Sequence, residues 1–160
     1  MAVSVNLDVR VVEPGDDDHV REAWELKERI REEQGVLRQR WGFFSDAYRR
    51  ARTHLYFADE DLVGFAVVRR DGYLLFLAVS PDYQGQGFGR RLIADLATEH
   101  NTVTCHTRTT NREALDFYES VGFERVRRVD NYYEDGGDAY YLRLGETEGL
   151  ASKIQRLLGG

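Results

Sequence analysis

Apolar and polar residues alternate near the start of the chain, which predicts a half-buried β-strand because successive strand side chains point to opposite faces. The apolar positions are Val5, Leu7, Val9 and Val11. Pro14-Gly15 ends this strand, and the three aspartates at 16–18 offer N-caps for a helix that runs to about residue 33. A second helix is expected around residues 44–51, whereas the segment 34–41 fits no single element.

The middle of the chain predicts three consecutive strands, because short segments rich in Val, Leu, Phe and Tyr are separated by turn residues. These segments are 53–58, 62–69 and 73–80. Asp71-Gly72, between the last two, is a strong hairpin signal. A further strand is expected at 103–108, after a glycine-rich loop and a helix that ends near residue 100.

The last part of the chain predicts a helix followed by a hairpin. Asn111 is expected to cap the helix, because its side chain can accept a backbone N–H, and Gly122 suits the helix end. The hairpin joins 123–133 to 139–144. A short amphipathic helix follows, with Leu150, Ile154, Leu157 and Leu158 as its apolar positions.

These elements follow the order β-α-α-β-β-β-α-β-α-β-β-α, which predicts an α/β (α+β) fold. Consecutive hairpins imply a mixed central sheet of about seven strands flanked by helices, and the crossover from residue 73 to residue 108 favours parallel pairing. We expect a single domain at residues 1–145 and a C-terminal helical tail at residues 146–160, since a chain of 160 residues suits one domain.

Composition excludes several classes of protein. The hydrophobic fraction of 42% is enough for a packed core, so a disordered chain is not expected. No apolar run approaches the ~20 residues of a membrane span, and the first residues lack the pattern of a signal peptide. Because Cys105 is the single cysteine, we expect no internal disulfide and assign no metal. A soluble cytoplasmic protein without a membrane partner is the expectation.

The charge balance bears on the partners. Asp and Glu number 28 against 22 Lys and Arg, which gives a net charge of −6 at pH 7. A net acidic chain is a poor general binder of nucleic acid, but it tolerates a cationic substrate such as an amine. Lysine occurs only as Lys27 and Lys153, a bias that salt adaptation or a GC-rich genome explains simply.

The sharpest local feature is the loop Gln84-Gly85-Gln86-Gly87-Phe88-Gly89 between a strand and a helix. Glycines let the backbone approach a ligand closely, and free N–H groups at a helix start attract phosphate. A bound anion would also remove the conflict of Arg90 and Arg91 with the helix dipole. A plain tight turn is the alternative. A dinucleotide fingerprint would need glycine in place of Arg90, and a P-loop would need Gly-Lys followed by Ser or Thr.

Two motifs in order give a more specific indication. The segment 79–89, VSPDYQGQGFG, resembles motif A of the GNAT (Gcn5-related N-acetyltransferase) family, whose core is Q/R-x-x-G-x-G/A. The segment 111–123, NREALDFYESVGF, is similar to motif B of the same family, N-x-x-A-x-x-F-Y-x-x-x-G-F. The resemblance covers roughly residues 5–144 and is strong from Tyr73 onward.

The resemblance implies a transfer of an acetyl group from acetyl-CoA to an amine. The loop backbone would hold the pyrophosphate of coenzyme A, and the exposed backbone of Ala78 and Val79 would pair with pantetheine. Many relatives carry Arg or Lys at the positions of Gly85 and Gln86, so Arg90 would supply the missing charge. The residues expected to bind the cofactor are Ala78, Val79, Gln84, Gly85, Gln86, Gly87, Phe88, Gly89, Arg90, Asn111 and Tyr118.

Acetyl transfer requires the amine to lose a proton, the carbonyl to be polarised, for instance by the Val79 N–H, and the leaving thiolate to be stabilised. By resemblance, Tyr118 is the candidate acid. Ribosomal-protein alanine acetyltransferases carry glutamate in place of His106, whereas San-type N-terminal acetyltransferases carry histidine, paired through ordered water with a tyrosine at the place of Tyr73. His106, with an ordinary pKa of ~6.5, is therefore the expected base together with Tyr73. An ordinary strand histidine and a packed helical tyrosine are the alternatives.

Aromatic residues are candidate substrate contacts. Tyr132 and Tyr133 resemble tyrosines that line the peptide channel of these N-terminal acetyltransferases, although neighbours on a strand point to opposite faces, so that only one would enter a site unless the strand bulges. Trp41, Phe43 and Phe44, expected between the first two helices, would line the pocket for the first substrate residue or else belong to the core.

The expected function is acetylation of a primary amine, foremost the α-amine of a protein or peptide N-terminus. A small-molecule amine acetyltransferase and a non-catalytic acyl-CoA-binding module are the alternatives, because one fold serves many substrates. Glu33 is a further candidate for recognising an amine. The sequence does not define the oligomeric state, and a homodimer is compatible with it.

Overall fold

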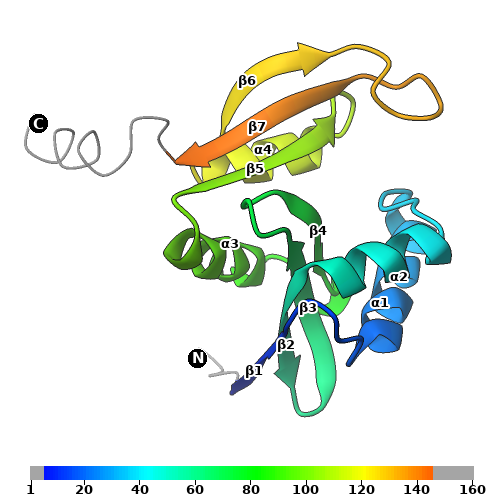
Figure 1. Cartoon of the computed structure of the whole chain (residues 1–160), viewed down its shortest axis with the longest axis vertical. Coiled ribbons are helices and arrows are strands. Elements are labelled where there is room, and N and C mark those ends of the chain that lie inside the picture. Colours follow the sequence, from blue (N-terminus) through cyan, green and yellow to red (C-terminus); the bar gives the residue numbers. More distant parts are fainter. Residues whose placement is uncertain (1–5, 146–160) are drawn as a thin grey trace, which may run out of the picture. The chain divides into compact units, whose positions relative to one another are not determined.

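The computed structural model describes residues 6–145. These residues form two compact units (Figure 1). The first unit contains residues 6–70 and 74–92, and the second contains residues 71–73 and 93–145. The predicted helical tail at 146–160 lies outside the described residues, so the domain boundary at residue 145 stays a prediction.

The first unit is built on an antiparallel sheet with the strand order β1-β2-β3-β4 (Figure 1). Its strands are β1 (Leu7–Val12), β2 (Arg52–Ala58), β3 (Asp61–Val68) and β4 (Leu74–Val79). Two helices, α1 (Val20–Gln34) and α2 (Trp41–Arg50), pack on one face, with α1 against β3 and β4 and α2 against β2. Because β4 ends the order, one of its backbone edges is outside the ladder of this sheet.

The core between the helices and this sheet is strongly aromatic. Phe44 and Tyr48 of α2 are fully buried. The Phe44 ring lies 6.0 Å from the ring of Phe65 and 5.0 Å from that of Phe76, measured between centroids. Burying each such aromatic side chain contributes roughly 2–3 kcal/mol, so this cluster holds α2 firmly on the sheet.

A buried lysine ties α1 to the segment that leads into α2. Lys27 is fully buried, and its ammonium donates hydrogen bonds to the carbonyl of Gln39 and to Glu28. It also lies 4.5 Å from the centre of the Trp24 ring. Desolvation lowers the pKa of Lys27. The hydrogen bonds and the ring contact offset part of the free-energy cost of burying its ammonium charge.

The first strand is confirmed, but the alternation predicted its buried face wrongly. Val9 and Val11 are 48% and 46% exposed, whereas Val12 is 5% exposed. The face that bears Val12 meets the core under α1 and α2, which explains the difference. On that same face the guanidinium of Arg10 lies 4.2 Å from the centre of the Phe57 ring.

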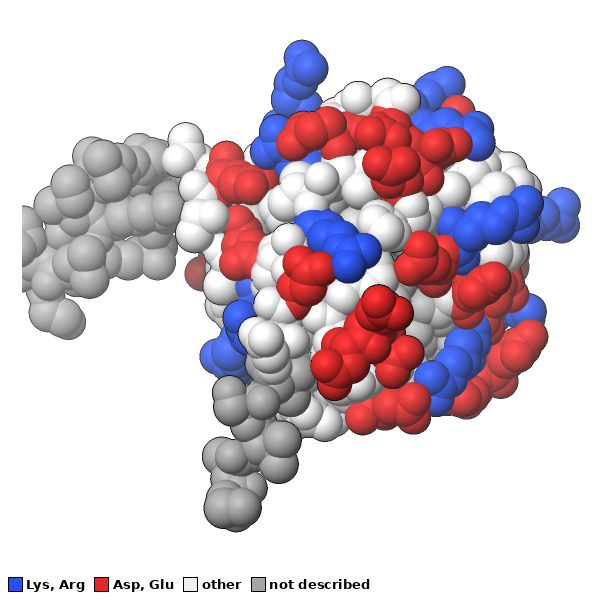
Figure 2. Space-filling view, turned by 90° about the horizontal axis from the view of Figure 1, so that it is seen from below, with Lys and Arg blue, Asp and Glu red and all other residues white. Residues whose placement is uncertain are grey.

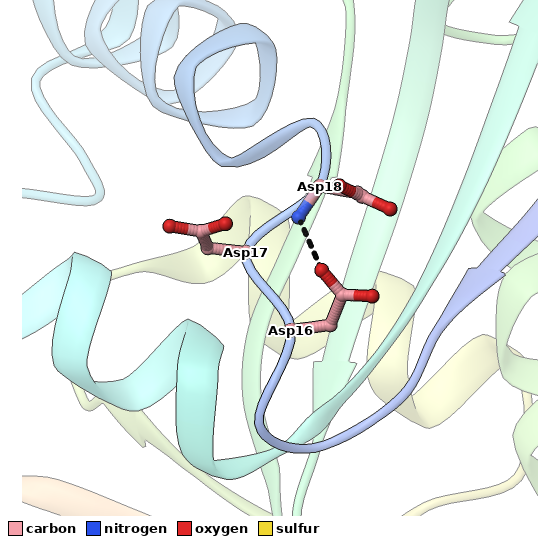
Figure 3. Close-up of side chains that lie close together, drawn as sticks. All are labelled: Asp16, Asp17 and Asp18. Atoms are coloured by element: carbon pink, nitrogen blue, oxygen red, sulfur yellow. Dashed lines mark hydrogen bonds between the residues drawn. The ribbon is translucent and has the colours of Figure 1, made fainter.

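The three aspartates before α1 do not cap it as predicted. The helix begins at Val20, and its N-cap is His19, which has φ 64° and no side-chain capping bond. The carboxylate of Asp16 instead accepts the N–H of Asp18 at 3.2 Å (Figure 3), a local turn that competes with capping. The three exposed carboxylates lie within 4.8 Å of one another, but acidic clusters of this kind are common without an ion, and we assign no metal here.

The second unit contains an antiparallel sheet with the order β5-β7-β6 (Figure 1). Its strands are β5 (Thr102–Arg108), β6 (Glu124–Val129) and β7 (Ala139–Gly145). The boundary between the units falls inside α3 (Phe88–Glu99). Buried and partly exposed residues alternate along β5, with Val103, Cys105 and Thr107 buried and His106 on the opposite face.

The helix before β6, α4 (Arg112–Ser120), has the predicted ends. The Asn111 side chain caps it by accepting the N–H of Ala114 at 3.1 Å. Gly122, just past its last turn, has φ 105°, a conformation that suits glycine. Both ends of this helix are therefore encoded locally.

The α/β fold and the seven strands are confirmed, but the strands form two antiparallel sheets instead of one mixed sheet. Parallel pairing among the described residues consists of one bridge between Tyr73 and Thr104. Gly72, with φ 86°, supports it, since its carbonyl accepts the Thr104 N–H at 3.0 Å. The segments joined by the crossover are thus parallel, as predicted, but their pairing is limited to this bridge and ends before β4 begins at Leu74.

Charges on the face shown in Figure 2 are interspersed rather than separated by sign. Exposed ion pairs include Arg50 with Asp46 at 3.4 Å and Arg49 with Asp17 at 3.6 Å. Solvent screens such pairs, so each contributes little to stability. None of the helices formed by residues 6–145 is long and apolar enough to cross a membrane.

Candidate functional site

The glycine loop presents open backbone amides at the start of α3. Gly85 and Gly87 have φ values of 78° and 86°, and a Cβ built on either residue would meet nothing within 4 Å. The N–H of Arg91 donates to the carbonyl of Gly87 at 3.1 Å as the first bond of the helix, so the preceding N–H groups are left to other acceptors. This geometry fits a phosphate-bearing group that approaches the backbone closely.

The neighbouring edge of β4 offers backbone groups to a ligand. Ala78 pairs with Phe65 of β3, and β4 has no strand on its other side within the first unit. The Gln84 side chain donates to the carbonyl of Val79 at 3.1 Å. Phe88 is 5% exposed and packs edge-on against Tyr83, so only its backbone can reach a cofactor.

Two side-chain contacts fasten this loop to α1. The guanidinium of Arg29 binds both carboxylate oxygens of Asp82, at 3.0 and 3.1 Å, and this pairing lowers the pKa of Asp82. Gln34 donates to the side chain of Gln84 at 3.1 Å. Glu33, a candidate for amine recognition, is instead paired with Arg29 at 3.1 Å. Arg90 is exposed and pairs with no carboxylate among residues 6–145, which leaves its charge available to an anion.

The second unit brings the expected base and its partner into direct contact. The Tyr73 hydroxyl lies 2.6 Å from Nδ1 of His106, a direct hydrogen bond where a bridging water was expected. The Tyr132 ring stacks on the imidazole with centroids 4.2 Å apart and an interplanar angle of 14°. Tyr132 also brings its hydroxyl to 3.4 Å from that of Tyr73. Tyr141 completes the surroundings, with its ring centroid 5.0 Å from that of His106.

The electrostatics of this group suit proton acceptance. Burial, with a contribution from the positive charge of Arg127, lowers the pKa of His106 below its ordinary value of 6.5. Burial also raises the pKa of Tyr73, so that its hydroxyl keeps its proton near neutral pH. A protonated phenol beside a neutral imidazole donates to Nδ1, which places the imidazole proton on Nε2.

Tyr118 lies on α4 and is partly buried. It interacts with the buried thiol of Cys105, whose pKa burial raises to about 12. Burial raises the pKa of Tyr118 well above 10, with smaller contributions from Cys105, Tyr133 and Tyr73. Asn111, expected to face the cofactor, has its side-chain oxygen engaged as the cap of α4.

The two hairpin tyrosines lie in the loop between β6 and β7, so the prediction that they sit on a strand was wrong. Asn131 before them has φ 53°, and the chain leaves the ladder after Val129. Tyr132 is 42% exposed and covers His106, as described above. The guanidinium of Arg108 lies 4.0 Å from the centre of the Tyr133 ring. Because a loop does not impose alternation, both rings reach the same group of residues.

The three aromatic residues expected between the helices belong to the first turn of α2 and have different surroundings. Phe44 is fully buried in the core, which corrects its assignment to a substrate pocket. Trp41 is partly buried and packs edge-on against Trp24 at 5.3 Å. Phe43 is 59% exposed and is the one of the three that offers its ring to a ligand.

Two residues of this group, Tyr141 and Arg127, were missed by sequence reasoning. Tyr141 pairs with His106 on one side and with Arg127 on the other. The guanidinium of Arg127 lies 4.6 Å from the centre of the Tyr141 ring. The predicted hairpin contained both residues, but only the strand register brings them beside His106.

The backbone N–H groups of the glycine loop are free at the start of α3, and the adjacent edge of β4 has no partner strand in the first unit. Together these features indicate an α/β protein that binds an anionic cofactor. The acetyltransferase (GNAT) domain model matches residues 26–141. The chain therefore belongs to the GNAT family, whose members take an acetyl group from acetyl-CoA.

Individual relatives agree with this family. N-alpha-acetyltransferase 30 of Saccharomyces cerevisiae is 35% identical over 98 residues, which cover 58% of this chain and 56% of that protein. N-alpha-acetyltransferase RimI of Mycobacterium tuberculosis is 40% identical over 92 residues, which cover 51% and 58%. The crystal structure of the ribosomal-protein-S18-alanine N-acetyltransferase from Escherichia coli superposes with a TM-score of 0.69 at 26% identity, covering 87% of this chain and 93% of that one. The chain spans about half the length of the curated relatives it matches.

Proposed function

We propose that this protein is an acetyl-CoA-dependent N-acetyltransferase whose acceptor is the α-amine of a protein or peptide N-terminus. The hydrogen bond between Tyr73 and His106, beside an exposed tyrosine on a loop, is the observation that carries this proposal. The names of the relatives support the acceptor class. Acetyl-CoA would be held by the amides of the glycine loop and by the edge of β4, with the charge of Arg90 nearby.

His106 acts as the base in a direct attack. The ammonium of the acceptor loses its proton to Tyr73, which passes its own proton to Nδ1 of His106. The freed nitrogen then forms the C–N bond at the thioester carbonyl, the C–S bond breaks, and the second proton that this nitrogen loses passes to the departing thiolate. A lowered pKa keeps His106 unprotonated and ready to accept at neutral pH.

The Val79 N–H polarises the carbonyl, and Tyr118 serves the leaving thiolate. A phenol whose pKa is raised well above 10 is a weak acid, and an ordinary thiol has a pKa near 8.5. Tyr118 therefore stabilises the thiolate by hydrogen-bond donation more than by complete proton transfer. To do so its hydroxyl would donate to the sulfur of coenzyme A.

Exposed and half-buried aromatic residues receive the acceptor. Tyr132 offers a hydroxyl to the peptide backbone, and Tyr133 contributes beside it. Phe43 and Trp41, both in the first turn of α2, contact the first side chain. These rings favour an apolar first residue.

A coenzyme A release assay tests this function. Peptides that vary in their first residue are compared with free lysine, spermidine and an aminoglycoside at equal amine concentration. We expect turnover of peptides with an apolar first residue and at least tenfold lower kcat/KM for the free amines. Faster turnover of a free amine would establish the small-molecule alternative.

The same assay separates the binding-module alternative. A module would bind acetyl-CoA in calorimetry and release no thiol with any amine. In that case His106→Gln would change nothing measurable. If the protein is the proposed enzyme, His106→Gln lowers kcat by roughly 100-fold, the usual contribution of a general base, and leaves the Kd for acetyl-CoA unchanged.

A further inference from the structure

Arg127 is an exposed cation without an acidic partner in the described part of the chain. It lies on β6, an edge strand of the second sheet, and no carboxylate of residues 6–145 forms an ion pair with it. Its neighbours differ in this respect, because Arg125 pairs with Glu119 and Arg128 pairs with Asp138, each at 2.6 Å. Arg127 can therefore bind an external anion without first breaking an ion pair within the described part of the chain.

The strand register places Arg127 on the same face of the sheet as His106. Both residues pair with Tyr141, one from each side, and directly paired residues of a sheet share a face. A register shift at Val126 separates Arg127 from Arg125, whose guanidinium lies over Tyr140 on the opposite face. The Tyr141 ring is 5.0 Å from the imidazole and 4.6 Å from the guanidinium. The guanidinium thus lies within about 10 Å of the imidazole, the length of roughly three extended residues.

We propose that Arg127 selects peptide substrates that carry a carboxylate side chain close to the N-terminus, centred on the third residue. This inference rests on the proposed function, because His106 marks where the α-amine reacts. A peptide that extends from His106 across Tyr141 brings its third side chain to the guanidinium, which binds carboxylates in a bidentate manner.

Other cations on this face are less suited to this role. Arg108 is engaged by Asp135 at 3.0 Å and by the ring of Tyr133. Arg143 is partly buried and is registered against Glu124, whose negative charge opposes an incoming anion. An acidic side chain of the peptide therefore gains the most binding free energy at Arg127.

The test uses three peptides that differ only in the third residue, which is Glu, Gln or Lys. At pH 8.5, where His106 is neutral with or without the nearby charge, we expect kcat/KM for the Glu peptide to exceed that for the Gln peptide about three- to fivefold. The difference arises in KM and fades in 0.5 M salt. Arg127→Gln removes the preference, and Arg127→Glu reverses it in favour of the Lys peptide. Arg125→Gln, on the opposite face of the same strand, retains it.

Equal kcat/KM for the three peptides in the wild type, or a preference that survives Arg127→Gln, would overturn this inference. If no peptide is acetylated, the proposed function fails, and binding alone then decides about Arg127. Fluorescence anisotropy of the Glu and Gln peptides, labelled at the C-terminus and measured with coenzyme A present, serves for this. Tighter binding of the Glu peptide that Arg127→Gln abolishes supports the inference, and equal binding overturns it.

Discussion

The hydrogen bond between Tyr73 and His106 can be removed by a change of one atom. Tyr73→Phe deletes the hydroxyl that lies 2.6 Å from Nδ1 and keeps the ring. In the wild type the hydroxyl donates to the neutral imidazole and thereby stabilises the unprotonated form. Without this bond, the pKa of His106 rises.

The size of the shift follows from the net worth of such a bond. A hydrogen bond contributes about 0.5–1.5 kcal/mol, and one pKa unit corresponds to 1.36 kcal/mol, so the pKa of His106 should rise by about 0.4–1.1 units. The acidic limb of the rate profile moves to higher pH by the same amount. Loss of the relay also lowers the rate plateau at least about tenfold, since water replaces the phenol imperfectly.

The pKa of His106 also makes folding stability depend on pH. Its folded pKa lies below the unfolded value of 6.5, so the unfolded chain binds more protons between the two values. The contribution of His106 to the free energy of unfolding is therefore fully present above about pH 6.5, and it is lost as the pH drops through the folded pKa. Tyr73→Phe brings the two values closer and flattens this part of the stability profile.

Imidazole NMR titration measures the shift directly, and the chain has only four histidines. The signals that disappear in His106→Gln identify His106. Its midpoint is then compared between the wild type and Tyr73→Phe. A midpoint that stays unchanged or falls in Tyr73→Phe would refute the reasoning, because the hydroxyl would then not be donating to a neutral imidazole.

Three further substitutions test other parts of the site. Gly87→Ala should cost about 1–2 kcal/mol of stability, because φ is 86° there, and should weaken acetyl-CoA binding in calorimetry at least tenfold; unchanged affinity would mean that no ligand approaches this backbone. Tyr118→Phe should lower kcat about 10- to 100-fold with little change in KM, and a thioester of a more acidic thiol should restore part of the lost rate. If Tyr118→Phe reacts equally fast with that thioester and with acetyl-CoA, the phenol does not assist the thiolate. Asn111→Ala should lower the free energy of unfolding by about 0.5–2 kcal/mol in urea titrations, while Asn111→Asp should retain the cap; equal loss in both variants would contradict a purely capping role.

Local signals in the sequence were sufficient for the glycine loop and for the helix of motif B. The glycines of the loop accept the positive φ values of the turn before α3, and motif B carries its own cap and stop at Asn111 and Gly122. Such signals act within a few residues, so they survive without knowledge of the tertiary fold. The predicted fold class and strand number were confirmed for the same reason.

Faces and partners depend on tertiary packing, and there the sequence was less informative. Alternation marked Val9 and Val11 correctly as one face of a strand, but only the helices packed on the sheet decide which face is buried. Phe44 and Phe43 are neighbours of the same type, yet one is fully buried and the other is 59% exposed. The helical period of α2 separates them, and the sequence had not indicated that α2 begins as early as Trp41.

The position of Arg127 beside His106 and Tyr141 depends on a single irregularity of the second sheet. In a regular strand Arg125 and Arg127 would point to the same face, because they are two residues apart. The register shift at Val126 sends them to opposite faces, one over Tyr140 and the other over Tyr141. Motifs A and B contain no trace of this shift, so two proteins with the same motifs can differ in the side chains that they present beside the residue at the place of His106. The acidic-peptide preference that we propose for Arg127 therefore depends on strand register, which motifs A and B do not encode.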